Sequence, residues 1–275
     1  MKSVLLLGQS NMAGRGFLHE VKPILDEHIL MLRNGRWQMM VEPIHFDRAI
    51  AGIGPAASFA KRWCDEHREE SIGLIPCAEG GSSIDEWSTD GVLFRHAVAE
   101  AKFALETSEL AAILWHQGEN DSYQGKYRDY ARKLEAIEEA LRRALNAPEV
   151  PFLVGGLGDY LGKAAFGANC TEYERVNAEL LRYASTHRHC CFVTGLGLKA
   201  NPDCIHINAE SQRRFGLRYY EALRTGQNVL EPLPDEQAMA EALSGGEYSP
   251  QVNSYLALEK FTQGKITFEE LVAAL

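Results

Sequence analysis

The sequence has no long apolar run and no cluster of positive charge. No segment approaches the roughly 20 consecutive apolar residues that cross a bilayer as a helix, which argues against an integral membrane protein. The 275 residues include 28 Lys and Arg against 38 Asp and Glu, a formal net charge of −10. Such a surface repels phosphate backbones and anionic lipids, so we expect neither nucleic acid nor a membrane as a partner.

Cysteine is scarce, and its spacing is not that of a metal or disulfide framework. None of the 6 cysteines belongs to a C-x-x-C pair. In the densest group, 187–191, Cys190 and Cys191 open an apolar run, so a strand would turn their side chains to opposite faces. We therefore predict no metal and no cofactor. The first apolar run begins at about Ser3 and leaves no room for a targeting peptide, which predicts a cytoplasmic protein with reduced thiols.

Apolar runs and amphipathic stretches alternate up to residue 227. The apolar runs predict five strands, at 4–7, 71–76, 111–115, 150–154 and 191–194. Helical periodicity fills the intervals at 55–67, 92–106, 127–145, 171–186 and 209–224. Because parallel neighbours need crossover connections, this order predicts an α/β fold: a three-layer α/β/α sandwich around a five-stranded parallel sheet, flavodoxin-like in its winding. A separate small hairpin is predicted at 29–40, turning on Asn34-Gly35.

The pattern changes after residue 227. Pro232, Pro234 and the Ser244-Gly245-Gly246 break predict a linker, and two helical stretches follow at 250–262 and 267–275. These helices are too short to form a core of their own. We therefore expect one domain over 1–227. Over 228–275 we expect a linker and a helical extension that packs on this domain or at a contact between copies of the chain.

Every predicted strand is followed by a polar, glycine-rich segment, and ligands of parallel α/β sheets bind at that edge. Ser10 lies in the first of these segments. Serine is a poor nucleophile unless a base, normally a histidine oriented by a carboxylate, takes its proton. Asp203 and His206 follow the fifth strand at a spacing that places both on one side of a tight loop. We therefore predict Ser10 as nucleophile, His206 as base and Asp203 as the acid that orients it.

An ester carbonyl under attack develops a negative oxygen that needs hydrogen-bond donors already in place. The backbone N–H of Ser10 offers one, and the Gly80-Gly81 turn offers another because no side chain blocks its approach. The carboxamide of Gln117 offers a third. A rival interpretation makes 8–16 a phosphate-binding loop, but this segment contains no lysine.

Four sequence blocks together resemble the SGNH hydrolases, and more closely their carbohydrate-esterase branch of sialate O-acetylesterase and acetylxylan esterase-like domains. The blocks are Gly-Gln-Ser-Asn at 8–11, Gly-Gly-Ser-Ser-Ile-Asp-Glu-Trp at 80–87, Trp-His-Gln-Gly-Glu-Asn-Asp at 115–121 and Asp-x-x-His at 203–206. The resemblance covers about 1–226. It implies the triad Ser10, Asp203 and His206, with oxyanion donors from Ser10, Gly81 and Gln117.

Further residues of these blocks are predicted to bind substrate or to support the site: Gln9, Asn11, Gly80, Ser82, Trp87 and Glu119. Trp87 is interpreted either as an apolar wall for a sugar ring or as a structural tryptophan. Glu119 is a second carboxylate at the same edge, which either orders the Ser10 loop, contacts substrate or replaces Asp203. Arg15 is read as a surface residue or as a partner for a substrate carboxylate. The stretches 17–47 and 160–169 are expected to shape the pocket.

These features predict a serine esterase that removes O-acetyl groups from a carbohydrate, a sialic acid or a xylan-type sugar ester, through an acyl-enzyme. Its partner is then a small acetylated sugar. Alternatives on the same fold are an acyltransferase or a general small-ester hydrolase. A sugar- or nucleotide-binding module without catalysis is a further alternative.

Overall fold

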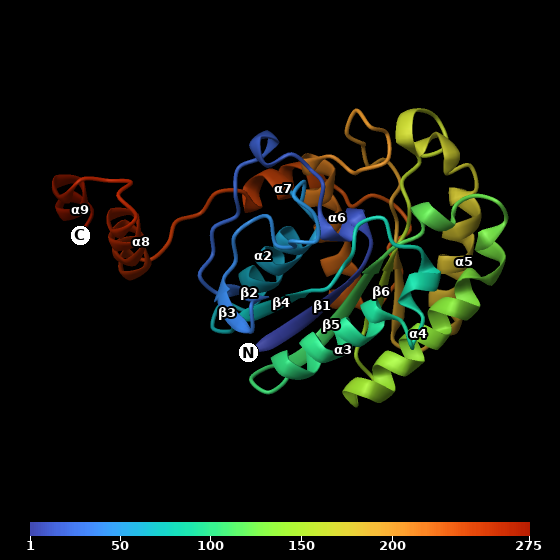
Figure 1. The fold of residues 1–275 in the computed structure, drawn as a ribbon. Coiled ribbons are helices and arrows are strands. Elements are labelled where there is room, and N and C mark those ends of the chain that lie inside the picture. Colours follow the sequence, from blue (N-terminus) through green and yellow to red (C-terminus); the bar gives the residue numbers. More distant parts are fainter.

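Seven strands form one sheet in the computed structural model, which describes residues 1–275 (Figure 1). Their order is β3-β2-β4-β1-β5-β6-β7, and every neighbouring pair is parallel except the β2–β3 hairpin. The strands are β1 (Lys2–Gly8), β2 (Ile29–Arg33), β3 (Arg36–Met39), β4 (Ile72–Pro76), β5 (Glu109–His116), β6 (Phe152–Gly155) and β7 (Cys190–Val193).

The prediction of five strands was wrong by two, because the hairpin joins the sheet. Asn34 and Gly35 take φ values of 51° and 67°, as a tight hairpin turn requires, so the turn itself is confirmed. β2 then pairs in parallel with β4, with Ile29 opposite Ile72. The local sequence predicts the hairpin, but the pairing of β2 with β4 depends on residues far apart in the chain.

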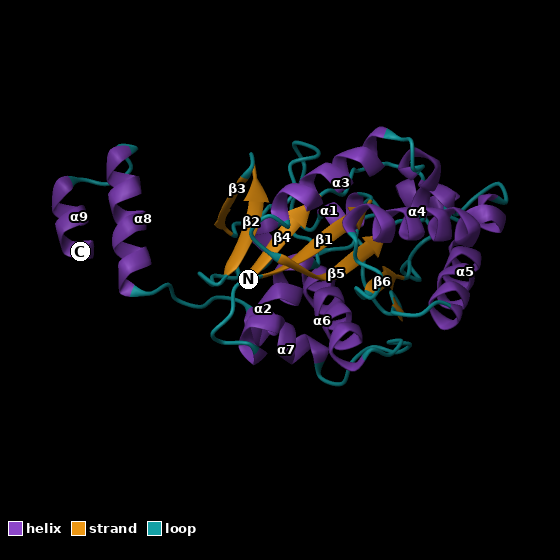
Figure 2. Ribbon diagram, turned by 90° about the horizontal axis from the view of Figure 1, so that it is seen from below, coloured by secondary structure: helices purple, strands orange, loops and turns teal.

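Helices cover both faces of the sheet, which confirms the predicted three layers (Figures 1 and 2). One face carries α2 (Ala56–Glu66), α6 (Ala209–Thr225) and α7 (Glu236–Leu243), and the other carries α3 (Val92–Ala104), α4 (Tyr130–Leu145) and α5 (Tyr173–Thr186). In β1, Val4 and Leu6 face the first set whereas Leu5 and Leu7 face the second. A strand buried on both sides reads as an unbroken apolar run.

Part of the stretch expected to be a linker is folded onto the domain. Val229 pairs with Val193, and α7 places Ala240 and Leu243 in the core. The buried Glu236 carboxylate accepts from the Arg218 guanidinium at 2.6 and 2.7 Å. The helix has only eight residues and lies between Pro234 and the Gly245-Gly246 break, which favour a linker, and this is why the sequence did not predict it.

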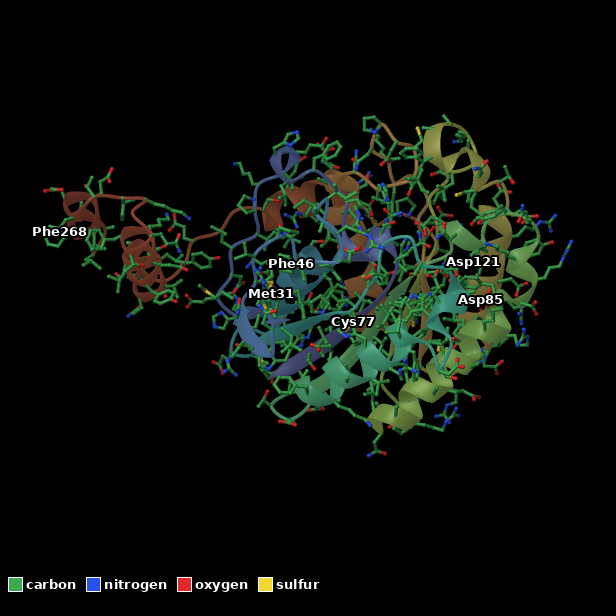
Figure 3. All side chains as sticks on the ribbon, viewed as in Figure 1. Met31, Phe46, Cys77, Asp85, Asp121 and Phe268 are labelled. Atoms are coloured by element: carbon green, nitrogen blue, oxygen red, sulfur yellow. The ribbon has the colours of Figure 1, made fainter.

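The last two helices lie apart from the sheet domain (Figures 1 and 2). They are α8 (Pro250–Thr262) and α9 (Phe268–Ala274), close to the predicted bounds. The chain leaves the domain where Gly245 pairs with Ile24, and Ser249 donates to Glu27 at 2.8 Å. Phe268, labelled in Figure 3, is exposed on this outlying pair. The pair is therefore not packed on its own domain. No helix of the chain combines the length and hydropathy of a membrane span.

Candidate active site

The carboxyl ends of β1, β4 and β5 are hydrogen-bonded to one another through the segments that follow them. The Gln9 N–H donates to the His116 carbonyl at 2.9 Å, and the Glu79 N–H donates to the Gly8 carbonyl at 3.0 Å. Gly8 has a φ of +127°, and a Cβ there would lie 2.0 Å from the His116 carbonyl oxygen. Only glycine therefore permits this close approach just before Ser10.

Ser10 is the first residue of α1 (Ser10–Ala13), a single helical turn at the end of β1. It is 5% exposed. The first backbone N–H groups of a helix have no acceptor within the helix, so the Ser10 N–H points out of the turn as a donor. Ser10 thus lies directly after the carboxyl end of β1, in the segment expected from the sequence.

Asp203 and His206 form a hydrogen-bonded pair, as their spacing predicts. The Asp203 Oδ2 and His206 Nδ1 atoms lie 2.7 Å apart, and Asp203 Oδ1 accepts the backbone N–H groups of Ile205 and His206 at 3.1 and 3.0 Å. Burial alone would raise the pKa of Asp203, but these hydrogen bonds and His206 hold it below its usual value. The carboxylate is therefore kept ionised and fixes the ring.

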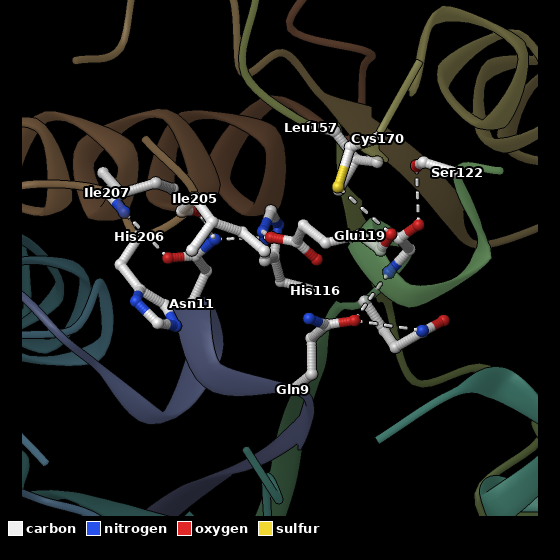
Figure 4. A network of polar contacts seen from close by, with 12 residues as sticks. Gln9, Asn11, His116, Glu119, Ser122, Leu157, Cys170, Ile205, His206 and Ile207 are labelled. Atoms are coloured by element: carbon white, nitrogen blue, oxygen red, sulfur yellow. Dashed lines mark hydrogen bonds and ion pairs between the residues drawn. The ribbon is translucent and has the colours of Figure 1, made fainter. Parts of the chain in front are cut away.

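The nucleophile turn is tied to the His206 loop by Asn11. Its Nδ2 donates to the Ile205 carbonyl at 3.0 Å, and its Oδ1 accepts the Ile207 N–H at 2.8 Å (Figure 4). The Ile205 carbonyl also accepts the Tyr160 hydroxyl at 3.2 Å. No hydrogen bond joins the Ser10 and His206 side chains themselves, and such contacts commonly tighten only when substrate binds. Asn11 therefore sets the position of His206 relative to Ser10.

Glu119 is hydrogen-bonded to Asn11 and makes no hydrogen bond to His206. Its Oε1 accepts from the Asn11 amide and lies 3.2 Å from His116 Nε2 (Figure 4). Burial would raise the pKa of Glu119, but His116 and Asn11 lower it below its usual value. Of the two carboxylates at this edge, Asp203 alone is bonded to His206.

The two glycines of the 80–81 turn have different surroundings. The Gly80 N–H donates to Asp47 Oδ2 at 2.8 Å and is thereby occupied. Gly81 has a φ of +82°, and its backbone N–H has no acceptor in the protein. A Cβ at Gly81 would meet nothing within 4 Å. The Gly81 N–H therefore has no acceptor in the protein, whereas the Gly80 N–H holds the turn in place.

Arg15 fits neither predicted interpretation. Its Nη2 lies 2.6 Å from Asp47 Oδ2, and both side chains are 3% exposed. A Cβ at Gly80 would come within 2.3 Å of the same nitrogen. Arg15 is therefore a buried support of the 80–81 turn and is not free to meet a substrate carboxylate.

The Gln117 amide is already engaged. Its Nε2 lies 3.1 Å from Gln9 Oε1, 3.2 Å from the Ser82 carbonyl and 2.6 Å from Asp121 Oδ2. An amide has two N–H groups, so three acceptors leave none for an oxyanion. The fully buried Gln117 joins the segments after three strands, which is a different role from the predicted donor.

Trp87 lies in the core, which contradicts its interpretation as a wall for a sugar ring. It is 0% exposed and packs edge-on against Trp115 with ring centroids 5.4 Å apart. Its Nε1 donates to Ser82 Oγ at 3.0 Å, and Ser82 Oγ donates to the Glu79 carbonyl at 2.9 Å. Both residues thus stabilise the segment that carries Gly81.

A hollow of about 560 Å³ opens beside the triad. Ile205, next to His206, lines one side of it, and Asn120, whose amide bonds the Gly81 carbonyl, lines another. The predicted pocket stretch 160–169 contributes Phe166 and Asn169. Tyr123 is a lining residue that sequence reasoning missed, since nothing in its local pattern marks it. A second hollow, which includes Lys2 and Pro151, lies at the opposite edge of the sheet.

No group of three His, Cys, Asp or Glu side chains is arranged to hold a metal ion. In the 187–191 cluster, His187 lies against Tyr183 and Glu135. Cys190 and Cys191 point into opposite core layers, as predicted for a strand.

The family to which the chain is similar agrees with this geometry. Residues 1–225 match the family described as "Carbohydrate esterase, sialic acid-specific acetylesterase". A probable carbohydrate esterase of Arabidopsis thaliana is 29% identical over 240 residues, which cover 79% of this chain and 88% of that relative.

Solved structures share the fold. An X-ray structure of an Arabidopsis thaliana protein matches with a TM-score of 0.72 at 27% identity, covering 82% of this chain and 98% of that one. NanS matches with a TM-score of 0.62 at 17% identity, covering 82% and 97%. A carbohydrate acetylesterase from Xanthomonas citri matches with a TM-score of 0.56 at 15% identity, covering 81% and 55%. The predicted carbohydrate-esterase branch is confirmed by the family match. The chain therefore belongs to the sialic acid-specific acetylesterase family of carbohydrate esterases and is a carboxylic ester hydrolase.

Proposed function

We propose that this enzyme removes O-acetyl groups from a carbohydrate through an acyl-enzyme formed on Ser10. One observation carries the proposal: Asn11, the residue after Ser10, bonds the backbone on both sides of His206, and His206 is in turn bonded to Asp203. The turn that carries the nucleophile is thus hydrogen-bonded to the loop that carries the base, and the base is hydrogen-bonded to its orienting carboxylate. The family match to acetylesterases supports the acyl group.

In the first step the Ser10 Oγ attacks the acetyl carbonyl carbon, and its proton passes to His206 Nε2. The carbonyl oxygen becomes an oxyanion that accepts the backbone N–H groups of Ser10 and Gly81. Asp203 stabilises the imidazolium that forms at His206. Donors fixed before the reaction lower the barrier because they need no reorganisation in the transition state.

In the second step the tetrahedral intermediate collapses, the bond to the sugar oxygen breaks, and that oxygen takes the proton from His206. Water then attacks the acetyl-Ser10 carbonyl while His206 removes its proton. Collapse of this second intermediate releases acetate and returns the proton to Ser10. A different acceptor in place of water would make the same acyl-enzyme an acyltransferase, which product analysis distinguishes by the fate of the acetyl group.

Substitution of the nucleophile tests the proposal. We expect Ser10→Ala to lower acetate release from 4-nitrophenyl acetate and from acetylated sugars by at least about 10³-fold, with an unchanged melting temperature. Ser185→Ala, an exposed serine on α5, is the control and retains full activity. Undiminished turnover in a folded Ser10→Ala variant would contradict the acyl-enzyme.

A further inference from the structure

Gly80 and Gly81 are the two central residues of a β-turn that runs from Glu79 to Ser82. The Ser82 N–H donates to the Glu79 carbonyl at 3.3 Å and closes the turn. Gly81 has a φ of +82°, whereas the φ of Gly80 is not positive. A positive φ at the third residue alone identifies a type II turn.

The peptide unit between Gly80 and Gly81 has two orientations open to it in such a turn. Type I and type II turns differ mainly by a reversal of this central unit, and a glycine at the third position adopts the backbone angles of either. The unit carries the Gly80 carbonyl on one side and the Gly81 N–H on the other, so a reversal exchanges them. An oxyanion that should meet the N–H would then face a carbonyl oxygen, which repels it.

Arg48 is hydrogen-bonded to this peptide unit. Its Nη2 donates to the Gly80 carbonyl at 3.1 Å. The guanidinium is itself fixed, because Nη1 donates to the Asp47 carbonyl at 3.0 Å and lies 2.6 Å from Glu79 Oε1. A carbonyl held towards Arg48 leaves the N–H of the same unit pointing the opposite way. A hydrogen bond at the carbonyl also polarises the unit and makes its N–H a stronger donor.

The other contacts of the turn hold the neighbouring peptide units. The Gly80 N–H, which donates to Asp47 Oδ2 at 2.8 Å, belongs to the preceding unit. The Gly81 carbonyl, which accepts from the Asn120 amide, belongs to the following unit. The Gly81 N–H has no acceptor in the protein. Arg48 is therefore the one side chain hydrogen-bonded to the central unit.

We propose that Arg48 is a positioning residue of the esterase reaction, which keeps the Gly81 N–H directed at the oxyanion by holding the Gly80 carbonyl. The proposal rests on the proposed function, because this N–H matters to the reaction only if an oxyanion forms at Ser10. Arg48 acts through the peptide unit and makes no hydrogen bond to a triad residue. Since Glu79 offsets its charge, its effect is geometric rather than a long-range field.

A double-mutant cycle with 4-nitrophenyl acetate tests this role. We expect Arg48→Ala to lower kcat about tenfold with an unchanged KM and melting temperature, since loss of a charged donor shifts the turn towards its reversed form. Gly81→Ala should lower kcat about 100-fold, because an L-residue favours the negative φ of a type I turn, although its Cβ meets nothing within 4 Å.

Arg224→Ala on α6 is the matched control and should keep the wild-type kcat. The Arg224 side chain is 48% exposed against 53% for Arg48, and each is paired with a glutamate. The double variant of Arg48→Ala and Gly81→Ala should be no slower than Gly81→Ala alone, since a peptide that is already reversed no longer depends on Arg48. An unchanged kcat in Arg48→Ala, or losses that multiply in the double variant, would overturn the proposal.

The proposed function fails by a different result, namely a wild type whose acetate release is absent or is unaffected by Ser10→Ala. Crystal structures of the wild type and Arg48→Ala then test the turn without any measurement of activity. A Gly80-Gly81 peptide that is reversed in Arg48→Ala supports the hold of Arg48 on this unit. A peptide with the wild-type orientation refutes it.

Discussion

At the scale of single residues, Asn11 decides whether Ser10 and His206 work together. Its amide makes two hydrogen bonds to the backbone that flanks His206, so its loss frees the His206 loop from the nucleophile turn. A displacement of about 1 Å at a catalytic group costs about 100-fold in rate. The residue acts through His206 and is a positioning residue in this sense.

We expect Asn11→Ala to lower kcat about 100-fold with little change in KM, because substrate binding does not depend on the position of His206. Steady-state kinetics with an acetyl ester measure both constants. Asn177→Ala is the matched control, since the Asn177 amide also makes two backbone bonds, to Leu157 at 2.7 and 2.9 Å, but contacts no triad residue. A folded Asn11→Ala variant with the wild-type kcat would refute this role.

The buried His45, a neighbour of Arg15 and Asp47, makes the stability of the folded chain depend on pH. Burial lowers its pKa from 6.5 to about 4; Arg15 acts in the same direction and Asp47 against it. Between these pH values the unfolded chain binds a proton at His45 that the folded chain does not. The free energy of unfolding therefore falls as pH drops from about 6.5 to 4, by about 3 kcal/mol for this group.

His45→Gln should remove this contribution, so that stability changes by about 3 kcal/mol less between pH 7 and pH 4 than in the wild type. Urea unfolding at a series of pH values measures the difference. His96→Gln, an exposed histidine on α3, is the control and keeps the wild-type slope. Parallel pH profiles for the wild type and His45→Gln would show that His45 is not the group responsible.

At the scale of elements, the junction of β1 and β5 tolerates only glycine at position 8. A Cβ at Gly8 would clash with the His116 carbonyl, and its φ of +127° is strained for other residues. We expect Gly8→Ala to destabilise the fold by more than about 3 kcal/mol and to lower activity, since Ser10 is two residues away. Chemical denaturation and acetate release measure the two effects.

Gly226→Ala separates the clash from the backbone strain. Gly226 ends α6 with a φ of +64°, and a Cβ there meets nothing within 4 Å. Its substitution should cost only about 1 kcal/mol, the price of the left-handed conformation. Equal losses for the two variants would mean that close packing at Gly8 contributes nothing.

Local pattern predicts most elements but not how they pair. The helix expected at 55–67 is α2 (Ala56–Glu66), because apolar periodicity and the entry through Pro55 are local signals. The place of β2 beside β4 depends on pairs such as Ile29 with Ile72, and the docking of α7 depends on its ion pair with Arg218 of α6. Periodicity within one segment carries no information about such partners.

At the scale of the whole molecule, topology explains which site residues sequence could predict. Ser10 and the Asp203–His206 pair follow strand ends, so a parallel sheet brings them together whatever the surroundings. Gln117 and Trp87 also follow strand ends or their loops, but whether a side chain is free or engaged depends on its tertiary neighbours. Sequence therefore predicts the position of these residues at the site more reliably than their roles.

The C-terminal helices predict an assembly of two copies. Leu258, Phe268 and Val272 are about half or more exposed on the α8–α9 pair, which lies apart from its own domain. Two short helices bury too little surface to be stable alone, so their apolar faces need a partner. A second copy offers the same faces, and pairing of two such helix pairs by a twofold axis would bury both.

Deletion of residues 247–275 should convert a dimer of the full chain into a monomer, as measured by light scattering after size-exclusion chromatography. The domain should keep its acetyl ester hydrolysis and its melting temperature, because the deleted segment is hydrogen-bonded to the sheet domain only through Ser249 and Glu27. Phe268→Asp in the full chain should have the same effect, since a charge cannot be buried in an apolar contact. A full chain that is monomeric at tens of micromolar would rule out this contact, and a truncated chain that remains dimeric would place it elsewhere.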